Sequence, residues 1–489
     1  MIAHPAFADD AVTWFTTVVE ATPGPGRRLN QETPMSSSTP ENPGSPVHAT
    51  QVLRNRKIWV GPIVVAAVFA ALVASVYIGS VINPTGHLHG LPVRIVDRDS
   101  GAVVDGHHLN VGASLTGALL RARPVTDRLS LTPGTMAQAE TQMDKGSAYA
   151  TLVIPATLTR SVLVAAGVHT PGTAPPATAA VELAENQRLG TTGANLASGV
   201  LTPAIGTIAA RIGTQLSALA TPAAKSNPIL ADRIAHPVAL TPTVYRPLPD
   251  HTALGLSAFY IALVGLVTGF LAAVLINASL DAALGYSSSQ MGPRFTQRRP
   301  VAINRLHTFL VKWAAATVAA PALTGGVLLV AAVGLGMHAP DWLLLWALLT
   351  LSTVMTTTGT LALIAIFGAI GPLLGVFFLV YLSLASSGAT IPIQALPGIF
   401  RTISHVEPLH NTLQGTRAIL YFGARGDAGL TTSLIVLASE LVFWAAVGFG
   451  ATYWFDRRIP ERITSDLTDP VGRTNGHPAA GRTAHPVAD

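Results

Sequence analysis

The chain has 489 residues, of which 49% are hydrophobic and 11% are charged, and its mean hydropathy is +0.46. An ordinary globular domain carries about 25% charged residues, so this composition excludes an ordinary soluble protein. The absence of cysteine excludes disulfide frameworks, thiolate metal sites and cysteine nucleophiles. The net charge is +5, but the basic residues lie mostly beside apolar segments, where they set membrane topology. No nucleic-acid partner is therefore expected.

Residues 1–53 are rich in proline, serine, threonine and glycine and have no sustained helical or alternating pattern. This composition predicts a disordered tail. Residues 1–30 lack the order of basic, apolar and cleavable segments that defines a signal peptide. Whether translation starts at Met1 or at Met35 stays open.

Six apolar segments are long enough to cross a bilayer, which takes about 18 or more apolar residues in a helix. They are predicted at residues 58–82, 254–276, 308–336, 342–367, 371–391 and 430–455. Three cations lie directly before the first segment at residues 54–57, four arginines lie in residues 277–307, and three more lie close after the last segment at residues 457–462. Because cytoplasmic loops are enriched in lysine and arginine, we expect a multi-pass protein of the cell membrane with both termini, including a disordered tail at 456–489, in the cytoplasm.

Residues 83–252 form the one large hydrophilic block, and this topology places it outside the cytoplasm. Strands are predicted at residues 91–97, 150–154 and 179–183, and helices at 114–123, 136–145 and 192–219. The proline- and threonine-rich residues 170–178 are expected to form a loop. Strands that alternate with helices predict an extracytoplasmic α/β or α+β domain. The expected fold class is thus an α-helical polytopic membrane protein with one helix before this domain and five after it.

Residues 392–429 form a second extracytoplasmic loop in this topology, whereas residues 277–307 are cytoplasmic. Within the former, residues 409–422 place apolar side chains among polar ones. This pattern predicts short helices at or dipping into the membrane interface, with a plain solvated loop as the alternative. The candidate site residues of this interfacial loop are Glu407, Pro408, His410 and Arg417.

Three stretches carry a resemblance to known proteins: LPVRIVDRDSG at residues 91–101, DKGSAYATLVIP at 144–155 and EPLHNTLQGTRAILYFG at 407–423. With the order of one helix, an external domain and five helices, they resemble the ABC-2 type permeases, in particular the phage-infection-protein (YhgE/Pip) and DUF3533-like membrane proteins. The resemblance implies a homodimer and export driven by a separate ATPase subunit that contacts the loop at residues 277–307. The candidate coupling residues of that loop are Asp281, Arg294, Arg298 and Arg299.

The chain lacks the motifs of an encoded motor or enzyme. No G-x-x-x-x-G-K-[ST] loop is present to cradle phosphates. No G-x-S-x-G elbow occurs, and no acid, base and nucleophile set converges. Four histidines at positions 87, 89, 107 and 108 could bind a transition metal, but solvated loop histidines are the preferred interpretation. We expect no enzyme, no cofactor and no metal site.

Two ionisable residues lie inside apolar segments. Lys312 is about one turn from the end of its segment, so its stem is expected to snorkel to the headgroups. Glu440 lies near the middle of the last segment and must face protein or water, because a charge facing lipid costs about 2.5–3.5 kcal/mol on insertion scales. A substrate-path or proton-relay carboxyl and a hydrogen-bonded strut both remain open for Glu440.

These patterns together predict the permease subunit of an ABC-2-like export system for an amphipathic or cell-envelope substrate. A non-transporting envelope receptor or scaffold is the alternative, with an external domain that binds a partner. Five helices beyond the first exceed what an anchor needs, and that excess favours transport.

Overall fold

The computed structural model describes residues 54, 56–104, 106–167, 180–291 and 293–459. The predicted tail at 1–53, the loop at 170–178 and nearly all of the predicted tail at 456–489 lie outside these residues. The chain divides into two compact units, residues 1–66 and 67–489. The division falls within helix α3, Arg56–Val81, which covers the first predicted apolar segment. All packing described below belongs to the second unit.

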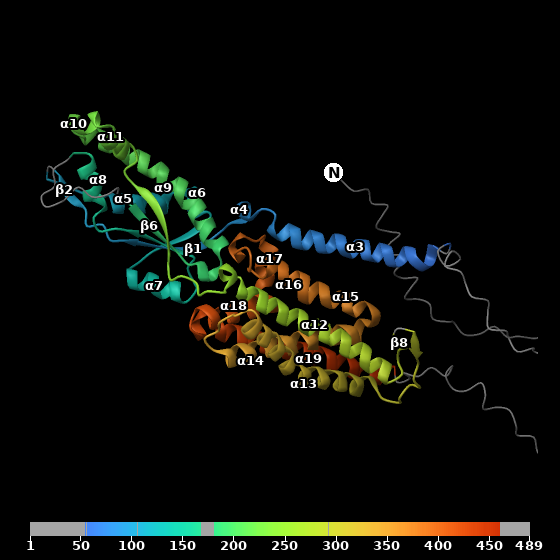
Figure 1. The fold of residues 1–489 in the computed structure, drawn as a ribbon. Coiled ribbons are helices and arrows are strands. Elements are labelled where there is room, and N and C mark those ends of the chain that lie inside the picture. Colours follow the sequence, from blue (N-terminus) through green and yellow to red (C-terminus); the bar gives the residue numbers. More distant parts are fainter. Residues whose placement is uncertain (1–53, 55, 105, 168–179, 292, 460–489) are drawn as a thin grey trace, which may run out of the picture. The chain divides into compact units, whose positions relative to one another are not determined.

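A five-stranded sheet forms the centre of the α/β domain (Figure 1), with the strand order β4-β1-β5-β6-β7. Its strands are β1 Leu91–Asp97, β4 Leu129–Pro133, β5 Ala150–Ile154, β6 Ala180–Glu185 and β7 Ala239–Val244. Strand β1 pairs in parallel with β4 and β5, with Ile95 opposite Pro133 and Leu152, whereas β5 and β6 are antiparallel. The short strands β2, Ala102–Val104, and β3, His107–Leu109, form a separate hairpin.

Helices cover both faces of this sheet, with α9 and α5 on one side and α7 on the other (Figure 1). The domain's helices are α4 Pro84–His87, α5 Val111–Arg121, α6 Arg123–Thr126, α7 Met136–Asp144, α8 Leu158–Ala165, α9 Thr191–Leu219, α10 Pro222–Ser226 and α11 Pro228–Ala235. Alternate residues of β1 point to opposite faces, so Leu91, Val93 and Ile95 enter one core together with Leu201 of α9 and Leu115 of α5.

The sequence patterns located β1 and β5 at their observed bounds but missed β4 and β7. Both missed strands contain a proline, Pro133 in β4 and Pro242 in β7. They are also the two outer strands of the sheet. Proline is tolerated at a sheet edge because one side of an edge strand needs no ladder hydrogen bond. A proline weakens the strand pattern of a short run, and β4 and β7 were missed for that reason, whereas the longer β1 was identified despite Pro92.

Apolar helices, most of them long, make up the bundle of the second unit (Figure 1). They are α12 Ser257–Ala283, α13 Arg305–Leu329, α14 Trp342–Phe367, α15 Gly371–Val376, α16 Leu382–Ser386 and α19 Leu430–Arg458. One π-helical turn, Val330–Gly334, extends α13, and another, Phe377–Tyr381, joins α15 to α16. Large apolar side chains such as Val318, Leu343 and Val442 are exposed on the bundle surface. A multi-pass membrane protein presents such a surface to lipid.

Six helical stretches among the described residues are long and apolar enough to span a membrane. One of them is α9, whose side chains instead fill the core of the α/β domain. Another runs over Trp342–Ser386 and contains a break at Gly368, which has φ 60° and ψ −126°. A Cβ at Gly371 would contact the Ile364 backbone, so α15 packs directly against the end of α14. This run therefore corresponds to the two predicted segments at 342–367 and 371–391.

Helix α14 packs closely against α12 through threonine hydroxyls. Thr353 donates to the Gly265 carbonyl at 3.1 Å, and Thr357 donates to the Gly269 carbonyl at 3.0 Å. Small residues allow helix backbones to approach closely, and hydroxyls then bond across the contact. The two hydrogen bonds therefore hold the backbones of α12 and α14 close together.

The predicted start of the loop at residue 277 differs from the structure. Helix α12 continues to Ala283, so Asp281 lies on its last turn rather than in a loop at 277–307. The rest of that loop contains a hairpin of β8, Ser289–Met291, and β9, Arg294–Thr296.

The loop predicted at 392–429 contains α17, Gly398–Ile403, and α18, Pro408–Tyr421. Every residue of α18 except His410 and Gln414 is buried. An interfacial helix would leave one face uncovered, so the structure differs from that prediction: protein surrounds α18 on nearly all sides.

Candidate functional site

The helix α18 lies where the α/β domain meets the bundle, and Glu407 caps its first turn. The Glu407 carboxylate accepts the backbone N–H of Leu409 at 2.7 Å and of His410 at 2.6 Å. Burial raises the pKa of Glu407 well above its ordinary value, the two N–H bonds oppose this shift, and the charge of Glu440 adds to it. The cap satisfies backbone donors that would otherwise be buried without partners.

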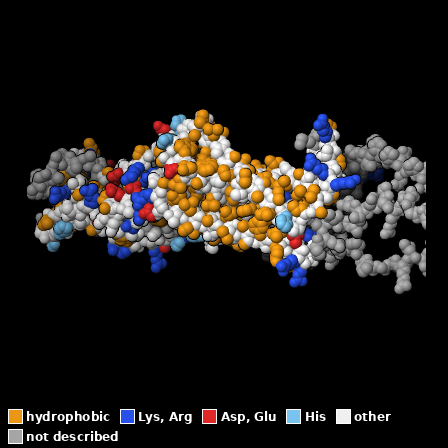
Figure 2. Space-filling model, turned by 90° about the horizontal axis from the view of Figure 1, so that it is seen from below, with side chains coloured by type: hydrophobic (Ala, Val, Ile, Leu, Met, Phe, Trp, Pro, Cys, Tyr) orange, Lys and Arg blue, Asp and Glu red, His pale blue; other side chains and the backbone are white. Residues whose placement is uncertain are grey.

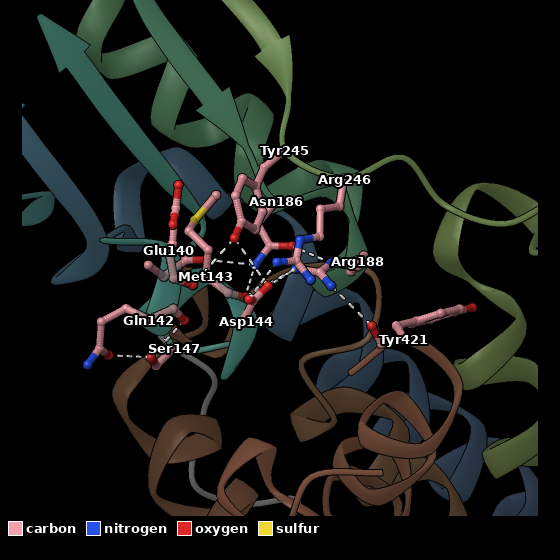
Figure 3. A network of polar contacts seen from close by, with 11 residues as sticks. Glu140, Gln142, Met143, Asp144, Ser147, Asn186, Arg188, Tyr245, Arg246 and Tyr421 are labelled. Carbon is pink, nitrogen blue, oxygen red and sulfur yellow. Dashed lines mark hydrogen bonds and ion pairs between the residues drawn. The ribbon is translucent and has the colours of Figure 1, made fainter. Parts of the chain in front are cut away.

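Arg188, in the turn between β6 and α9, connects the α/β domain to the C-terminal end of α18 (Figure 3). Its guanidinium donates to the Tyr421 carbonyl at 3.2 Å and to the Asp144 carboxylate at 3.2 Å. Further donors reach the Asn186 side chain at 3.3 Å and the Met143 carbonyl at 3.4 Å. The side chain is 8% exposed, so these bonds replace the water that burial removes.

Aromatic rings and a second arginine complete this Arg188 network. The guanidinium of Arg188 lies 4.7 Å from the ring centre of Phe422, the residue that follows α18. Tyr245 donates its hydroxyl to Asp144 at 3.2 Å, and Arg246 pairs with the same carboxylate at 2.9 Å. Charge-assisted hydrogen bonds and cation–π contacts of this kind resist separation in a buried setting. The network therefore ties α7, β6 and the segment after β7 to α18.

A small pocket next to this network brings together all three stretches that carry the sequence resemblance. It measures about 100 Å³ and is named here the Arg417 pocket. Its lining residues are Pro92, Gly146, Ser147, Tyr149, Leu189, Gly388, Ile393, Gln394, His410, Gln414 and Arg417. Pro92 comes from the first stretch, Ser147 and Tyr149 from the second, and His410 and Arg417 from the third. Residues more than 300 positions apart thus form one site.

Burial changes the titration of two side chains in the Arg417 pocket. Desolvation lowers the pKa of His410 to about 4, although its Nδ1 lies 2.8 Å from the Ser387 carbonyl. The imidazole is therefore neutral at neutral pH, with Nδ1–H as the donor to that carbonyl. Burial also raises the pKa of Tyr149, so its phenol keeps its proton. Among the described residues that line this pocket, Arg417 alone then carries a charge at neutral pH.

A second pocket, of about 580 Å³, lies at the other end of the bundle and is named here the lysine pocket. Residues of α12, α13, α14, α15 and α19 line it, among them Lys312, Asp281 and Asn277. Lys312 is 8% exposed; its ammonium lies 2.6 Å from the Asp281 carboxylate and 2.7 Å from the Asn277 amide oxygen. The prediction that Lys312 snorkels to headgroups is wrong, because a carboxylate one helix away neutralises its charge within the protein.

The four predicted coupling residues separate into two groups. Asp281 is engaged in the ion pair with Lys312, whereas Arg294, Arg298 and Arg299 are exposed on and after the β8–β9 hairpin. Figure 2 shows Lys and Arg side chains gathered at this end, beyond hydrophobic side chains that cover the bundle. The three arginines remain available to a partner.

Glu440 lies on α19, and both of its carboxylate oxygens are shielded from solvent. Neither oxygen has a hydrogen-bond partner within the residues that the structure describes. A hydrogen-bonded strut between helices requires such a partner, so this geometry lends no support to the strut, and the role of Glu440 in transport stays a prediction.

The four histidines proposed as a metal alternative do not form a cluster. His87 contacts the Asn83 carbonyl at 2.8 Å, and His89 contacts the Asp127 carbonyl at 2.7 Å. His107 and His108 lie on β3. Within the described ranges, no group of three or more metal-ligating side chains occurs.

Sequence reasoning missed Arg188 and Tyr149 as site residues. Arg188 belongs to the polar triplet at residues 186–188, which lies between an apolar strand and an apolar helix. Such a triplet is typical of an ordinary turn. Its partner Tyr421 is 233 positions away, and no local pattern reports such a contact.

Comparison with known proteins gives one match. The model of the family described as "Protein of unknown function (DUF3533)" matches residues 63–442. No curated protein and no solved structure matches the chain.

Proposed function

The chain belongs to the DUF3533 family, and from this premise we propose that it is the membrane permease subunit of an ABC-2-like export system for an amphipathic or cell-envelope substrate. The observation that carries the proposal is the lysine pocket. Five helices of the bundle surround it, and it contains a buried ion pair between α12 and α13. Helices that serve as an anchor need no polar cavity between them, and ionisable groups inside membrane helices mark functional paths.

The proposal includes an orientation and partners. The β8–β9 hairpin and both termini face the cytoplasm, the α/β domain lies outside it, and the protein resides in the cell membrane. The exposed Arg294, Arg298 and Arg299 form the contact with a separate ATPase subunit. Two copies assemble as a homodimer in the lipid bilayer. The Arg188 network supports coupling, because movements of the bundle around α18 would reach the α/β domain through it.

A non-transporting receptor is the second candidate, and a groove on the α/β domain favours it. The groove measures about 590 Å³ and lies between α5, α6 and α9. Its apolar lining includes Val125 and Val200, and Arg121 and Arg211 are exposed beside them. An apolar floor with basic side chains at its rim fits an amphipathic anionic partner.

Reversing the charge of Arg298 and Arg299 to glutamate tests the permease proposal. We expect loss of ATPase co-purification from mild detergent and loss of export, with membrane insertion retained, because both side chains are exposed and fill no core. The measurements are pull-down of the ATPase and efflux of a fluorescent acyl-chain amphiphile from cells.

The matched control changes the charge by the same amount on the α/β domain. Arg123 and Arg160 are also exposed, and their reversal to glutamate should leave both measurements unchanged. If the Arg298 and Arg299 variant still co-purified with an ATPase and exported, the proposed coupling contact would be wrong. If no ATPase co-purified with the unmodified chain, the receptor function would be favoured.

Glu440→Gln tests whether this carboxyl serves transport. The glutamine keeps the shape but cannot ionise, so we expect export to be lost while the melting temperature stays within about 3 °C. Ser439→Ala, at the exposed neighbouring position, is the control and should leave export intact. Normal export by the glutamine variant would remove Glu440 from the transport path.

A further inference from the structure

We propose that the Arg417 pocket is a binding site for an anionic group, a carboxylate or a phosphate. The ligand is either a small free anion or the anionic headgroup of an amphiphile. This inference goes beyond the proposed transport function and does not depend on it, because it concerns binding at one site.

Arg417 is buried without a counter-ion among the residues that the structure describes. The residue is 2% exposed, and one terminal nitrogen donates to the Ala389 carbonyl at 3.3 Å. Its Nε has no hydrogen-bond partner, and no carboxylate of the described chain lies within 4.0 Å of the guanidinium. Placing an ion in such a position costs several kcal/mol unless a charge of opposite sign accompanies it. A bound anion supplies that charge.

Arg188, which lies in the adjacent network, contrasts with Arg417. Arg188 is also buried, but it reaches a carboxylate, an amide oxygen and two carbonyls. Groups of the protein itself, among them the Asp144 carboxylate, therefore neutralise the buried guanidinium of Arg188, which has a structural role. Among the described residues, Arg417 has no such arrangement: its guanidinium donates to the Ala389 carbonyl.

The chemistry of the lining also fits an anion. None of the side chains that line the Arg417 pocket is an aspartate or a glutamate. Burial raises the pKa of Tyr149, so the phenol keeps its proton. The nearby charge of Arg417 lowers this pKa to a smaller extent. Gln394 contributes a buried side-chain oxygen with no partner, free to accept from a protonated acid group. A cation, a phenol and an amide around one small space match a carboxylate or a phosphate.

The size and the apolar part of the lining agree with this ligand class. About 100 Å³ exceeds the roughly 30 Å³ that one water occupies in the liquid, so one small polyatomic anion fits. Pro92, Leu189 and Ile393 line other parts of the pocket and offer contact to the first carbons of an acyl chain. The two ligand sources thus share the charged group and differ in the chain attached to it.

The experiment uses the purified full-length chain in an uncharged detergent and measures its melting temperature against ligand concentration. One arm titrates inorganic phosphate and acetate at constant ionic strength, set with sodium chloride. The other arm adds a lysophosphatidate or the matching monoacylglycerol, which lacks the phosphate. A ligand that binds the folded state raises the melting temperature in a saturable way.

We expect Arg417→Gln to weaken the apparent affinity at least about tenfold, since a charge-assisted hydrogen bond is lost. Arg425→Gln is the matched control: this exposed arginine lies in the same loop and pairs with Asp427, and its loss should leave the affinity unchanged. If Arg417→Gln does not fold, Tyr149→Phe removes one donor from the same pocket and should weaken binding less.

The outcomes separate the sources. Stabilisation by phosphate or acetate assigns the site to free anions. Stabilisation by the lysophosphatidate alone assigns it to an anionic amphiphile. The proposal is overturned if none of these probes stabilises the protein, or if the Arg417 and Tyr149 variants respond as strongly as the unmodified chain. Failure of the Arg298 and Arg299 test would leave this result untouched, because binding is measured without an ATPase or transport.

Discussion

Lys312→Met is expected to destabilise the protein by about 3 kcal/mol, because it leaves the Asp281 carboxylate without its cation. The side chain of Asp281 is 22% exposed and that of Lys312 is 11% exposed, so little water can replace the lost contact at 2.6 Å. The quantity to measure is the free energy of unfolding in detergent, obtained by chemical denaturation.

Two controls separate charge from packing in this test. The double variant Lys312→Met with Asp281→Leu removes both charges and should recover most of the loss, as buried ion pairs often exchange for apolar pairs at little cost. Lys145→Met breaks an ion pair with Asp427 that is far more exposed, and it should cost less than about 1 kcal/mol. Equal stability of the Lys312 and Lys145 variants would contradict the buried ion pair.

Arg188→Met is expected to cost about 3 kcal/mol and to loosen α18 from the α/β domain. The methionine keeps an apolar stem but leaves the Tyr421 carbonyl without this donor, and the Asp144 carboxylate keeps only the Tyr245 hydroxyl and Arg246 as partners. Faster hydrogen exchange of residues 418–424 and new proteolytic cleavage near Gly423 would report the change. The global free energy of unfolding alone would not show that the change lies at α18.

Arg188→Lys distinguishes geometry from charge in this network. A lysine ammonium cannot reach the Tyr421 carbonyl and the Asp144 carboxylate as the forked guanidinium does, so it should rescue little. Arg160→Met, at an exposed position of α8, is the control and should leave exchange near α18 unchanged. Full rescue by lysine would mean that charge alone holds the network together.

The sequence alone determined the elements whose signals are local. Strands β1 and β5 and helix α14 occupy the predicted residues, because alternating and continuous apolar patterns depend on near neighbours. The five apolar segments of the bundle could be counted for the same reason. Membership in a DUF3533-like group also followed from three short stretches, and the family model confirms it over residues 63–442. The wider kinship with ABC-2 permeases remains part of the proposal.

The tertiary structure decided the surroundings of those elements that residues distant in the sequence bury. Helix α9 is apolar enough to span a membrane, but length and hydropathy cannot distinguish a lipid environment from a protein core. Residues 409–422 have the amphipathic pattern of an interfacial helix, yet the domain and the bundle bury both faces of α18. A local pattern shows that a side chain is buried from water, but it does not show whether lipid or protein covers that side chain.

The same limit applies to the charged residues of the candidate sites. Lys312 pairs with a carboxylate 31 positions away, Arg188 reaches a carbonyl 233 positions away, and Arg417 has no carboxylate of the described residues within 4.0 Å. In sequence, each is a single cation near apolar residues. Whether a buried charge is neutralised from within or left for a ligand depends on groups that folding brings together, and only the tertiary structure contains that information.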